Sequence, residues 1–204
     1  MRLTQRAIRS LAGVLAVIAV VTVWHAGRAE SQAADPVTLA RQALDANRVE
    51  QAIAILEKAV AADPKNPAAL AWLGSAQVRM ARTVSFFNAP GWVKKGFNTL
   101  DQAVDRFPDV FIVYMVRGIT ATNVPDLFRK AEVALKDLST VITMRERSPD
   151  TVPDSVMPSV YLNLGRAYKK NGQPAEARAT WEKGKTLYPA APEAQAIDKE
   201  LRSL

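Results

Sequence analysis

Seven small, aromatic and turn-forming residues near the C-terminal end of the chain keep a fixed spacing. The order is aromatic-x2-Leu-Gly-x2-Tyr, then Ala-x3-aromatic and a final proline. This spacing is typical of two antiparallel helices joined by a turn. Such a unit cannot bury its apolar face alone, so it has to stack on neighbours of the same kind. The residues are Tyr161, Leu164, Gly165, Tyr168, Ala177, Trp181 and Pro189.

Each position in this pattern has a physical role. We expect Gly165 to let the two helices approach closely and Trp181 to fill the space between them. Gly172 can adopt the left-handed conformation that ends the first helix, and Pro189 stops the second. Gly184 departs from the pattern, which prefers alanine there, so we expect it to weaken the second helix by about 1 kcal/mol.

The same register occurs earlier in the chain, with a regular unit at the start and two irregular units in the middle. In the first middle unit, Gly74 to Pro108 spans 34 residues instead of 24, which places an insertion near Thr83–Trp92. A proline-rich connector separates the last two units. We therefore expect an all-α solenoid of about four helical hairpins and a C-terminal capping helix. The expected repeats are 36–64, 67–108, 111–147 and 158–189, and the capping helix is 191–204.

The first 33 residues have the order of a secretory signal. Three arginines precede Leu11–Trp24, an uncharged run of 14 residues, and small residues follow. A permanent membrane span needs about 20 apolar residues, so we expect cleavage after Ala29 or Ala33. The alternative is an uncleaved anchor helix in the inner membrane. Either outcome would export the repeats, and we expect the periplasm of a Gram-negative bacterium.

Charge and composition narrow the classes of partner and chemistry. The formal net charge is +7, and the first 33 residues contribute four Arg and one Glu, which leaves about +4 for the repeats. This modest charge does not indicate nucleic-acid binding. The chain has no Cys, and its one histidine is His25. We expect no enzymatic activity, cofactor or metal, because the usual nucleophiles, bases and ligands are missing.

The first helix of each repeat would line the concave face of such a stack. The side chains expected there mix cations with apolar residues and include few acids, which favours a protein or peptide partner with acidic groups. The alternative is that these cations only keep an exposed helix soluble. The candidate partner-binding residues are Arg41, Arg79, Asn123, Arg166, Lys169 and Lys170.

The insertion supplies a second candidate surface. Phe86, Phe87 and Trp92 lie near a Pro-Gly turn, and exposed aromatic residues would form a strong contact site. We favour the alternative that they fold back to cover a widened gap between the two helices, because large aromatic residues are mostly buried.

The last repeat closely resembles the tetratricopeptide repeat family, and the first does so moderately. The middle is similar to a group of exported bacterial tetratricopeptide-like proteins, through Trp92–Gly96, Arg117-Gly118 and Pro125–Phe128. The resemblance implies an α-solenoid that acts as a scaffold for other proteins and carries no catalytic residues. The alternatives are a membrane-tethered subunit of an envelope or transporter complex, and a carrier of a hydrophobic small ligand bound between Phe86, Phe87, Trp92 and Phe128.

Overall fold

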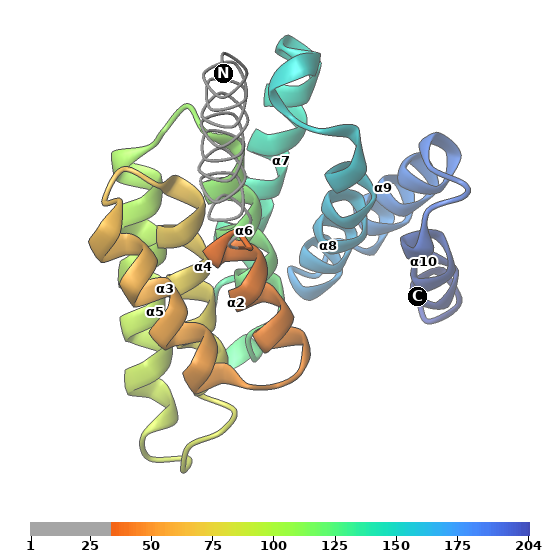
Figure 1. Cartoon of the computed structure of the whole chain (residues 1–204). Coiled ribbons are helices and arrows are strands. Elements are labelled where there is room, and N and C mark those ends of the chain that lie inside the picture. Colours follow the sequence, from red (N-terminus) through yellow and green to blue (C-terminus); the bar gives the residue numbers. More distant parts are fainter. Residues whose placement is uncertain (1–33) are drawn as a thin grey trace, which may run out of the picture. The chain divides into compact units, whose positions relative to one another are not determined.

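The computed structural model describes residues 34–204, which form nine α-helices, three 3-10 helices and no β-strand (Figure 1). The all-α prediction is therefore confirmed over this range. The expected signal or anchor at residues 1–33 lies outside the described residues. The helices are α2 (Pro36–Asp45), α3 (Val49–Ala62), α4 (Pro67–Met80), α5 (Ala89–Arg106), α6 (Phe111–Thr122), η2 (Asp126–Phe128), α7 (Ala131–Arg147), η3 (Pro149–Thr151), η4 (Asp154–Val156), α8 (Met157–Lys170), α9 (Pro174–Leu187) and α10 (Pro192–Arg202).

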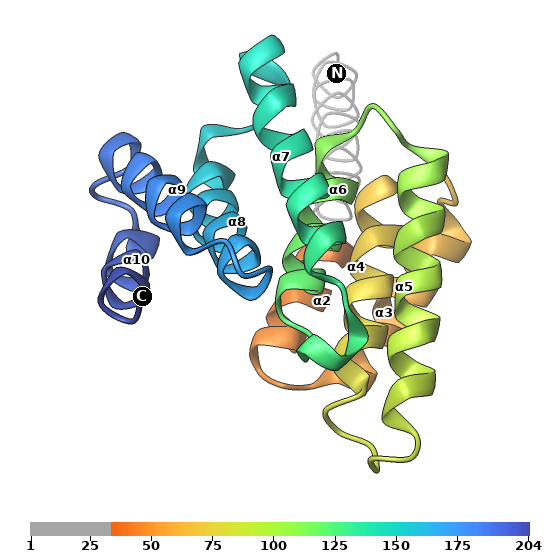
Figure 2. The same cartoon turned by 180° about the vertical axis from the view of Figure 1, so that it is seen from behind.

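The α-helices pack as four consecutive hairpins, α2 with α3, α4 with α5, α6 with α7 and α8 with α9 (Figures 1 and 2). The first helices of successive hairpins, α2, α4, α6 and α8, also contact one another in that order. Helix α10 packs on α8 and α9 at the end of the stack. This arrangement is the expected α-solenoid with a terminal helix. None of the helices in residues 34–204 combines the length and apolarity that a bilayer span requires.

The last hairpin is held by the close contact that the sequence pattern predicts. Trp181 is fully buried, and its Nε1 donates a hydrogen bond of 2.9 Å to the Leu162 carbonyl. A Cβ atom at Gly165 would lie 2.2 Å from that Nε1. The expectation for Gly184 left out its packing, because a Cβ there would lie 2.6 Å from the Tyr161 Cβ. Alanine has the higher helix propensity, but it would force Tyr161 or the helices to shift.

Helices α4 and α5 pack through two facing glycines, Gly74 and Gly96. A Cβ at Gly96 would lie 2.6 Å from the Gly74 carbonyl oxygen. This contact leaves no gap for the inserted aromatic residues to cover. Phe86 and Phe87 are 81% and 90% exposed on the connector between α4 and α5, so the favoured prediction that they fold back is wrong. Trp92 is half-buried, but it packs against the core formed by α2, α3 and α4 and does not fill a gap between α4 and α5.

The proline-rich connector between α7 and α8 is folded into η3 and η4 and is tied to α7. Arg145 donates hydrogen bonds to the carbonyls of Pro149 and Val152 and pairs with Asp154 at 3.1 Å. The Tyr188 hydroxyl, which follows α9, donates a 2.9 Å hydrogen bond to the same Asp154 carboxylate. Burial and this hydrogen bond raise the pKa of the Tyr188 hydroxyl to about 12.

This raised pKa predicts a loss of stability at high pH. The Tyr188 contribution is complete below the ordinary tyrosine pKa of about 10, and it declines as the pH rises to about 12, because the unfolded chain ionises first. We expect the difference in unfolding free energy between the wild type and Tyr188→Phe to shrink across this window. Urea unfolding at about pH 9 and about pH 11.5 measures it. Parallel declines in both proteins would show that Tyr188 is not responsible.

Candidate partner-binding cleft

A cleft of about 780 Å³ lies on the row of first helices. Its walls come from α2, α4, α6, the start of α5, the connector before α5 and the segment around η2, and the end of α8 reaches one edge. Clefts of this size lie within the range that proteins use for ligands and for anchoring side chains. The solenoid therefore brings three hairpins together at one hollow surface.

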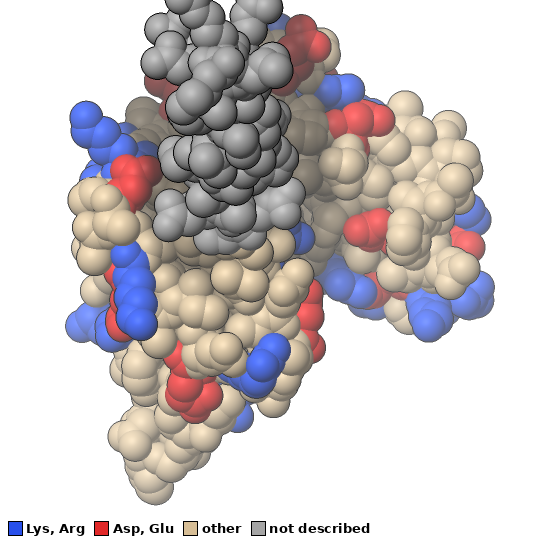
Figure 3. All heavy atoms as spheres, viewed as in Figure 1, with Lys and Arg blue, Asp and Glu red and all other residues tan. Residues whose placement is uncertain are grey.

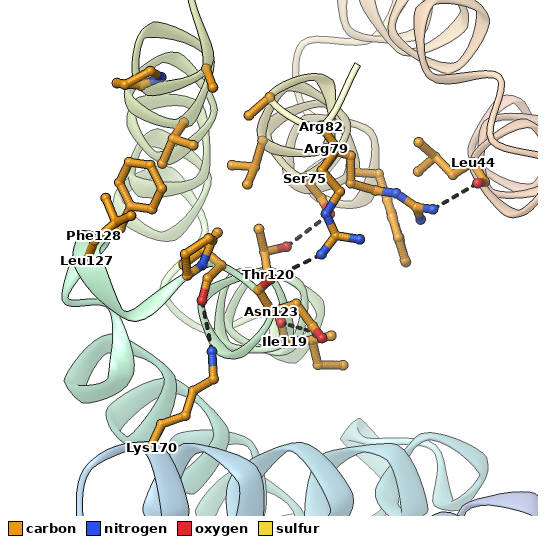
Figure 4. Close-up of a pocket in the computed structure, with 18 of the residues that line it drawn as sticks. Leu44, Ser75, Arg79, Arg82, Ile119, Thr120, Asn123, Leu127, Phe128 and Lys170 are labelled. Carbon is orange, nitrogen blue, oxygen red and sulfur yellow. Dashed lines mark hydrogen bonds between the residues drawn. The ribbon is translucent and has the colours of Figure 1, made fainter. Parts of the chain in front are cut away.

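One side of the cleft carries the apolar side chains of Phe128 and Leu127 (Figure 4). Val78, Val93 and Ile119 also line the cleft, and these three residues and Phe128 are buried or half-buried. At its rim, Leu127 is 71% exposed. Phe86 lines the same cleft from the opposite connector. Large apolar side chains left in water around a hollow are typical of a contact surface.

Two arginines of α4 and the turn after it face this apolar side. Figure 4 shows the Arg79 and Arg82 guanidinium groups on one side of the cleft and Leu127 and Phe128 on the other. Arg79 donates a 2.9 Å hydrogen bond to the Leu44 carbonyl, and Arg82 donates one of 3.1 Å to the Asn123 carbonyl. These bonds to the backbone of α2 and of the residue after α6 hold both guanidinium groups in place.

The three arginines of the cleft are not matched by acids. Within residues 34–204, no carboxylate forms an ion pair with Arg41, Arg79 or Arg82. Asp45 is the one acidic residue among those that line the cleft. Arg79 is half-buried, and a partly desolvated charge gains most from an opposite charge. The cleft is thus suited to an anionic group that lies next to apolar side chains.

The floor of the cleft is fixed by a buried hydrogen bond between two first helices. The Thr120 hydroxyl donates to the Ser75 hydroxyl over 2.9 Å, and both side chains are buried (Figure 4). Arg41 lies 5.1 Å from the centre of the Trp72 ring, which joins α2 to α4 at one edge. These contacts hold α2, α4 and α6 together, so the shape of the cleft is fixed before a partner binds.

The predicted binding residues divide into two groups. Arg41, Arg79, Asn123 and Lys170 line the cleft. Lys170 also donates to the Val124 carbonyl at 2.8 Å and pairs with Asp126 at 3.2 Å. The structure does not bring the other two predicted residues to the cleft.

Arg166 and Lys169 instead contact the terminal helix α10 and the residue after it. Arg166 pairs with Glu200 at 2.7 Å, and Lys169 donates a 2.9 Å hydrogen bond to the Ser203 hydroxyl. The three predicted binding residues of α8 therefore do not share one surface. Lys170 lines the cleft, whereas Arg166 and Lys169 contact the C-terminal end of the chain.

The three aromatic candidates of the insertion do not all lie at the cleft. Phe86 lines the cleft, whereas Phe87 and Trp92 are not among its lining residues. Sequence reasoning missed Arg82 and Leu127. Arg82 stands three residues after Arg79, which is the spacing of side chains that share a helix face, so the helix period could have indicated it. The side chains of residues 34–204 form no group of three His, Cys, Asp or Glu that could hold a metal ion.

Comparison with known proteins gives the same family for two parts of the chain. Tetratricopeptide repeat family models match residues 43–84 and residues 158–190. No curated protein matches the sequence. A thermophilic tetratricopeptide repeat protein of Thermus thermophilus has a similar crystal structure, with a TM-score of 0.69, 19% identity, and coverage of 98% of this chain and 97% of that one.

Two structures of MamA are also similar. MamA of strain MSR-1 has a TM-score of 0.51 and 25% identity, with coverage of 76% of this chain and 73% of that one. A MamA mutant has a TM-score of 0.51 and 23% identity, with coverage of 79% and 81%. The family models, the spacing around Gly165 and the stacked hairpins agree, and the chain contains tetratricopeptide repeats within residues 43–84 and 158–190.

Proposed function

We propose that this protein is a non-catalytic scaffold that holds a segment of a partner protein in the α2–α4–α6 cleft. Tetratricopeptide repeat proteins are generally scaffolds for protein–protein interaction. The observation that carries the proposal is the cleft itself, where two fixed arginines without ion pairs in the described chain face exposed apolar side chains. The partner segment would place apolar side chains against Ile119 and Phe128 and an acidic group near Arg79 and Arg82.

We propose that the protein acts in the cell envelope. The basic start and the uncharged run Leu11–Trp24 support export to the periplasm. An anchored subunit of an envelope complex is the alternative for the same leader. The intact mass of the protein recovered from envelope fractions distinguishes a cleaved leader from a retained anchor.

Of the aromatic residues considered for a hydrophobic small ligand, Phe86 and Phe128 line the cleft. The cations at the opposite wall favour a segment with a charged group over a purely apolar molecule.

Removal of the two guanidinium charges tests the proposal. We expect the double variant Arg79→Gln and Arg82→Gln to weaken partner capture by about tenfold or more, because charge-assisted contacts in a partly buried cleft are lost. The amide side chains can still donate hydrogen bonds, which limits damage to the fold. The measurement is quantitative pull-down from crosslinked envelope extracts.

The control lies outside the cleft. Lys58 on α3 and Lys136 on α7 are exposed, and their replacement by Gln gives the same change in net charge. We expect this control to capture as much partner as the wild type. Equal capture by the cleft variant and the wild type would contradict the proposed role of the two arginines.

A further inference from the structure

The connector between α4 and α5 has an apolar tip, and only one of its two phenylalanines, Phe86, lines the cleft of the proposed function. Phe86 and Phe87 stand side by side at its end, with ring centroids 6.0 Å apart in an edge-to-face arrangement. They are the two most exposed large apolar side chains in residues 34–204, at 81% and 90%. Phe87 lies outside the cleft, so a segment bound there would leave it in water.

The connector projects beyond the ends of the neighbouring helices in both views (Figures 1 and 2). In Figure 3 the same end of the molecule is a projection of uncharged residues, with both acidic and basic residues above it. An apolar tip at an extremity can reach a flat surface without interference from the rest of the stack. A flat surface is also the one that a projecting tip fits, because Phe87 is 90% exposed at its end.

The charges behind the tip have one sign over a long stretch. Residues 64–100 contain five Lys and Arg and no Asp or Glu. Arg82 precedes the two phenylalanines, and Lys94 and Lys95 follow one to two turns into α5. All three are exposed. The charged residues that come before and after the tip in this stretch of the sequence are therefore all cations.

A half-buried tryptophan lies between the tip and these lysines. Trp92 is in the first turn of α5, and Lys95 Nζ lies 4.9 Å from its ring centroid. The order phenylalanine, tryptophan, lysine along this end matches the depth order of the membrane interface, where apolar side chains enter the acyl region and Trp and Lys stay at the headgroups. Cations next to an anionic leaflet add electrostatic attraction to this burial.

We propose that the Phe86–Phe87 tip inserts into the surface of an anionic lipid bilayer, so that the scaffold is held against a membrane while the cleft holds its partner. The occupant is a lipid surface, because a paired apolar tip between Arg82 and the two lysines of α5 fits a negative, flat and apolar layer. This contact is reversible, since two side chains bury far less apolar area than a spanning helix.

The lack of cysteine makes a direct test available. The full chain has no Cys, so Ser85→Cys gives one labelling site beside the tip and keeps both phenylalanines. An environment-sensitive fluorophore (NBD) on the new thiol reports entry into lipid by a shift of its emission to shorter wavelength. The probe surface is vesicles of phosphatidylcholine with roughly a third phosphatidylglycerol, which supply the negative surface potential. The control label is at Lys58→Cys on α3, away from the tip.

We expect the label at position 85 to shift on the anionic vesicles and the label at position 58 to stay unshifted. Adding Phe86→Ser and Phe87→Ser should abolish the shift at position 85, while Leu187→Ser, at a 52% exposed apolar residue of α9, should leave it intact. Lys94→Glu with Lys95→Glu should weaken vesicle binding at the tip by about tenfold or more, against no change for Lys58→Glu with Lys136→Glu.

Two results would overturn the inference. One is a label at position 85 that stays unshifted on anionic vesicles, or that shifts equally without the two phenylalanines. The other is capture of a protein that depends on Phe86 and Phe87 in the absence of lipid, together with a label at position 85 that does not shift on vesicles. This result would assign the tip to a protein partner. Capture through the Arg79 and Arg82 cleft is measured separately without vesicles, so failure of the tip leaves the proposed function standing.

Discussion

Replacing Gly96 by alanine lowers the free energy of unfolding by about 3 kcal/mol, although alanine is the better helix former. The added Cβ would lie 2.6 Å from the Gly74 carbonyl oxygen and 2.7 Å from the Val78 backbone nitrogen. Backbone atoms cannot turn aside as the end of a side chain can, so α4 and α5 have to separate. This separation outweighs the gain in helix propensity, which is about 1 kcal/mol.

The control for this prediction lies in the same helix. Gly91 in α5 has no atom within 4 Å of an added Cβ. We therefore expect Gly91→Ala to raise stability by up to about 1 kcal/mol. Urea unfolding of both variants measures the two effects, and the same sign in both would contradict the close approach of α4 and α5. Because α4 carries Arg79, we also expect Gly96→Ala to weaken partner capture.

Replacing Asp137 by alanine is expected to cost about 3 kcal/mol, because it removes the buried partner of a largely buried cation and leaves that cation only the half-exposed Asp101. Arg117 on α6 binds the Asp137 carboxylate of α7 with two hydrogen bonds, of 2.7 and 2.8 Å. The side chain of Asp137 is 0% exposed and that of Arg117 is 12% exposed. Arg117 also reaches Asp101 of α5 at 2.8 Å, so one arginine joins three helices.

Asp101 supplies the matched control on the same arginine. Its side chain is 53% exposed, so we expect Asp101→Ala to cost less than about 1 kcal/mol. A double variant, Asp137→Leu with Arg117→Met, should recover much of the loss, because it removes both buried charges. Chemical denaturation gives all three values. Equal costs for Asp101→Ala and Asp137→Ala would show that burial does not govern this network.

The hairpins could be predicted because their packing depends on residues near in sequence. Gly165 and Trp181 lie 16 positions apart, and their contact is set by the period of two helices and one turn. The helix ends follow from local conformation in the same way, since Asn47 and Gly172 have φ angles of 56° and 74°. These features depend on each repeat alone.

The surroundings of exposed residues could not be predicted in this way. The acid that pairs with Arg166 is Glu200 on α10, which lies outside the repeat pattern. Whether Phe86 and Phe87 are buried depends on whether α4 and α5 leave a gap between them. The close contact of Gly74 with Gly96 decides this. Arg117 and Asp137 lie in one hairpin, α6 with α7, but the pattern of small and aromatic residues does not specify which polar side chains pair across it.

Site-specific photo-crosslinking from within the cleft tests the central claim most directly. A benzoylphenylalanine at Ile119 would stand in the lining of the cleft, and one at Lys136 would stand on the exposed face of α7. The account predicts a crosslinked partner from Ile119 that is lost in the Arg79→Gln and Arg82→Gln background, and no such product from Lys136. The same product from both positions, or one from Lys136 alone, would contradict partner binding in the cleft.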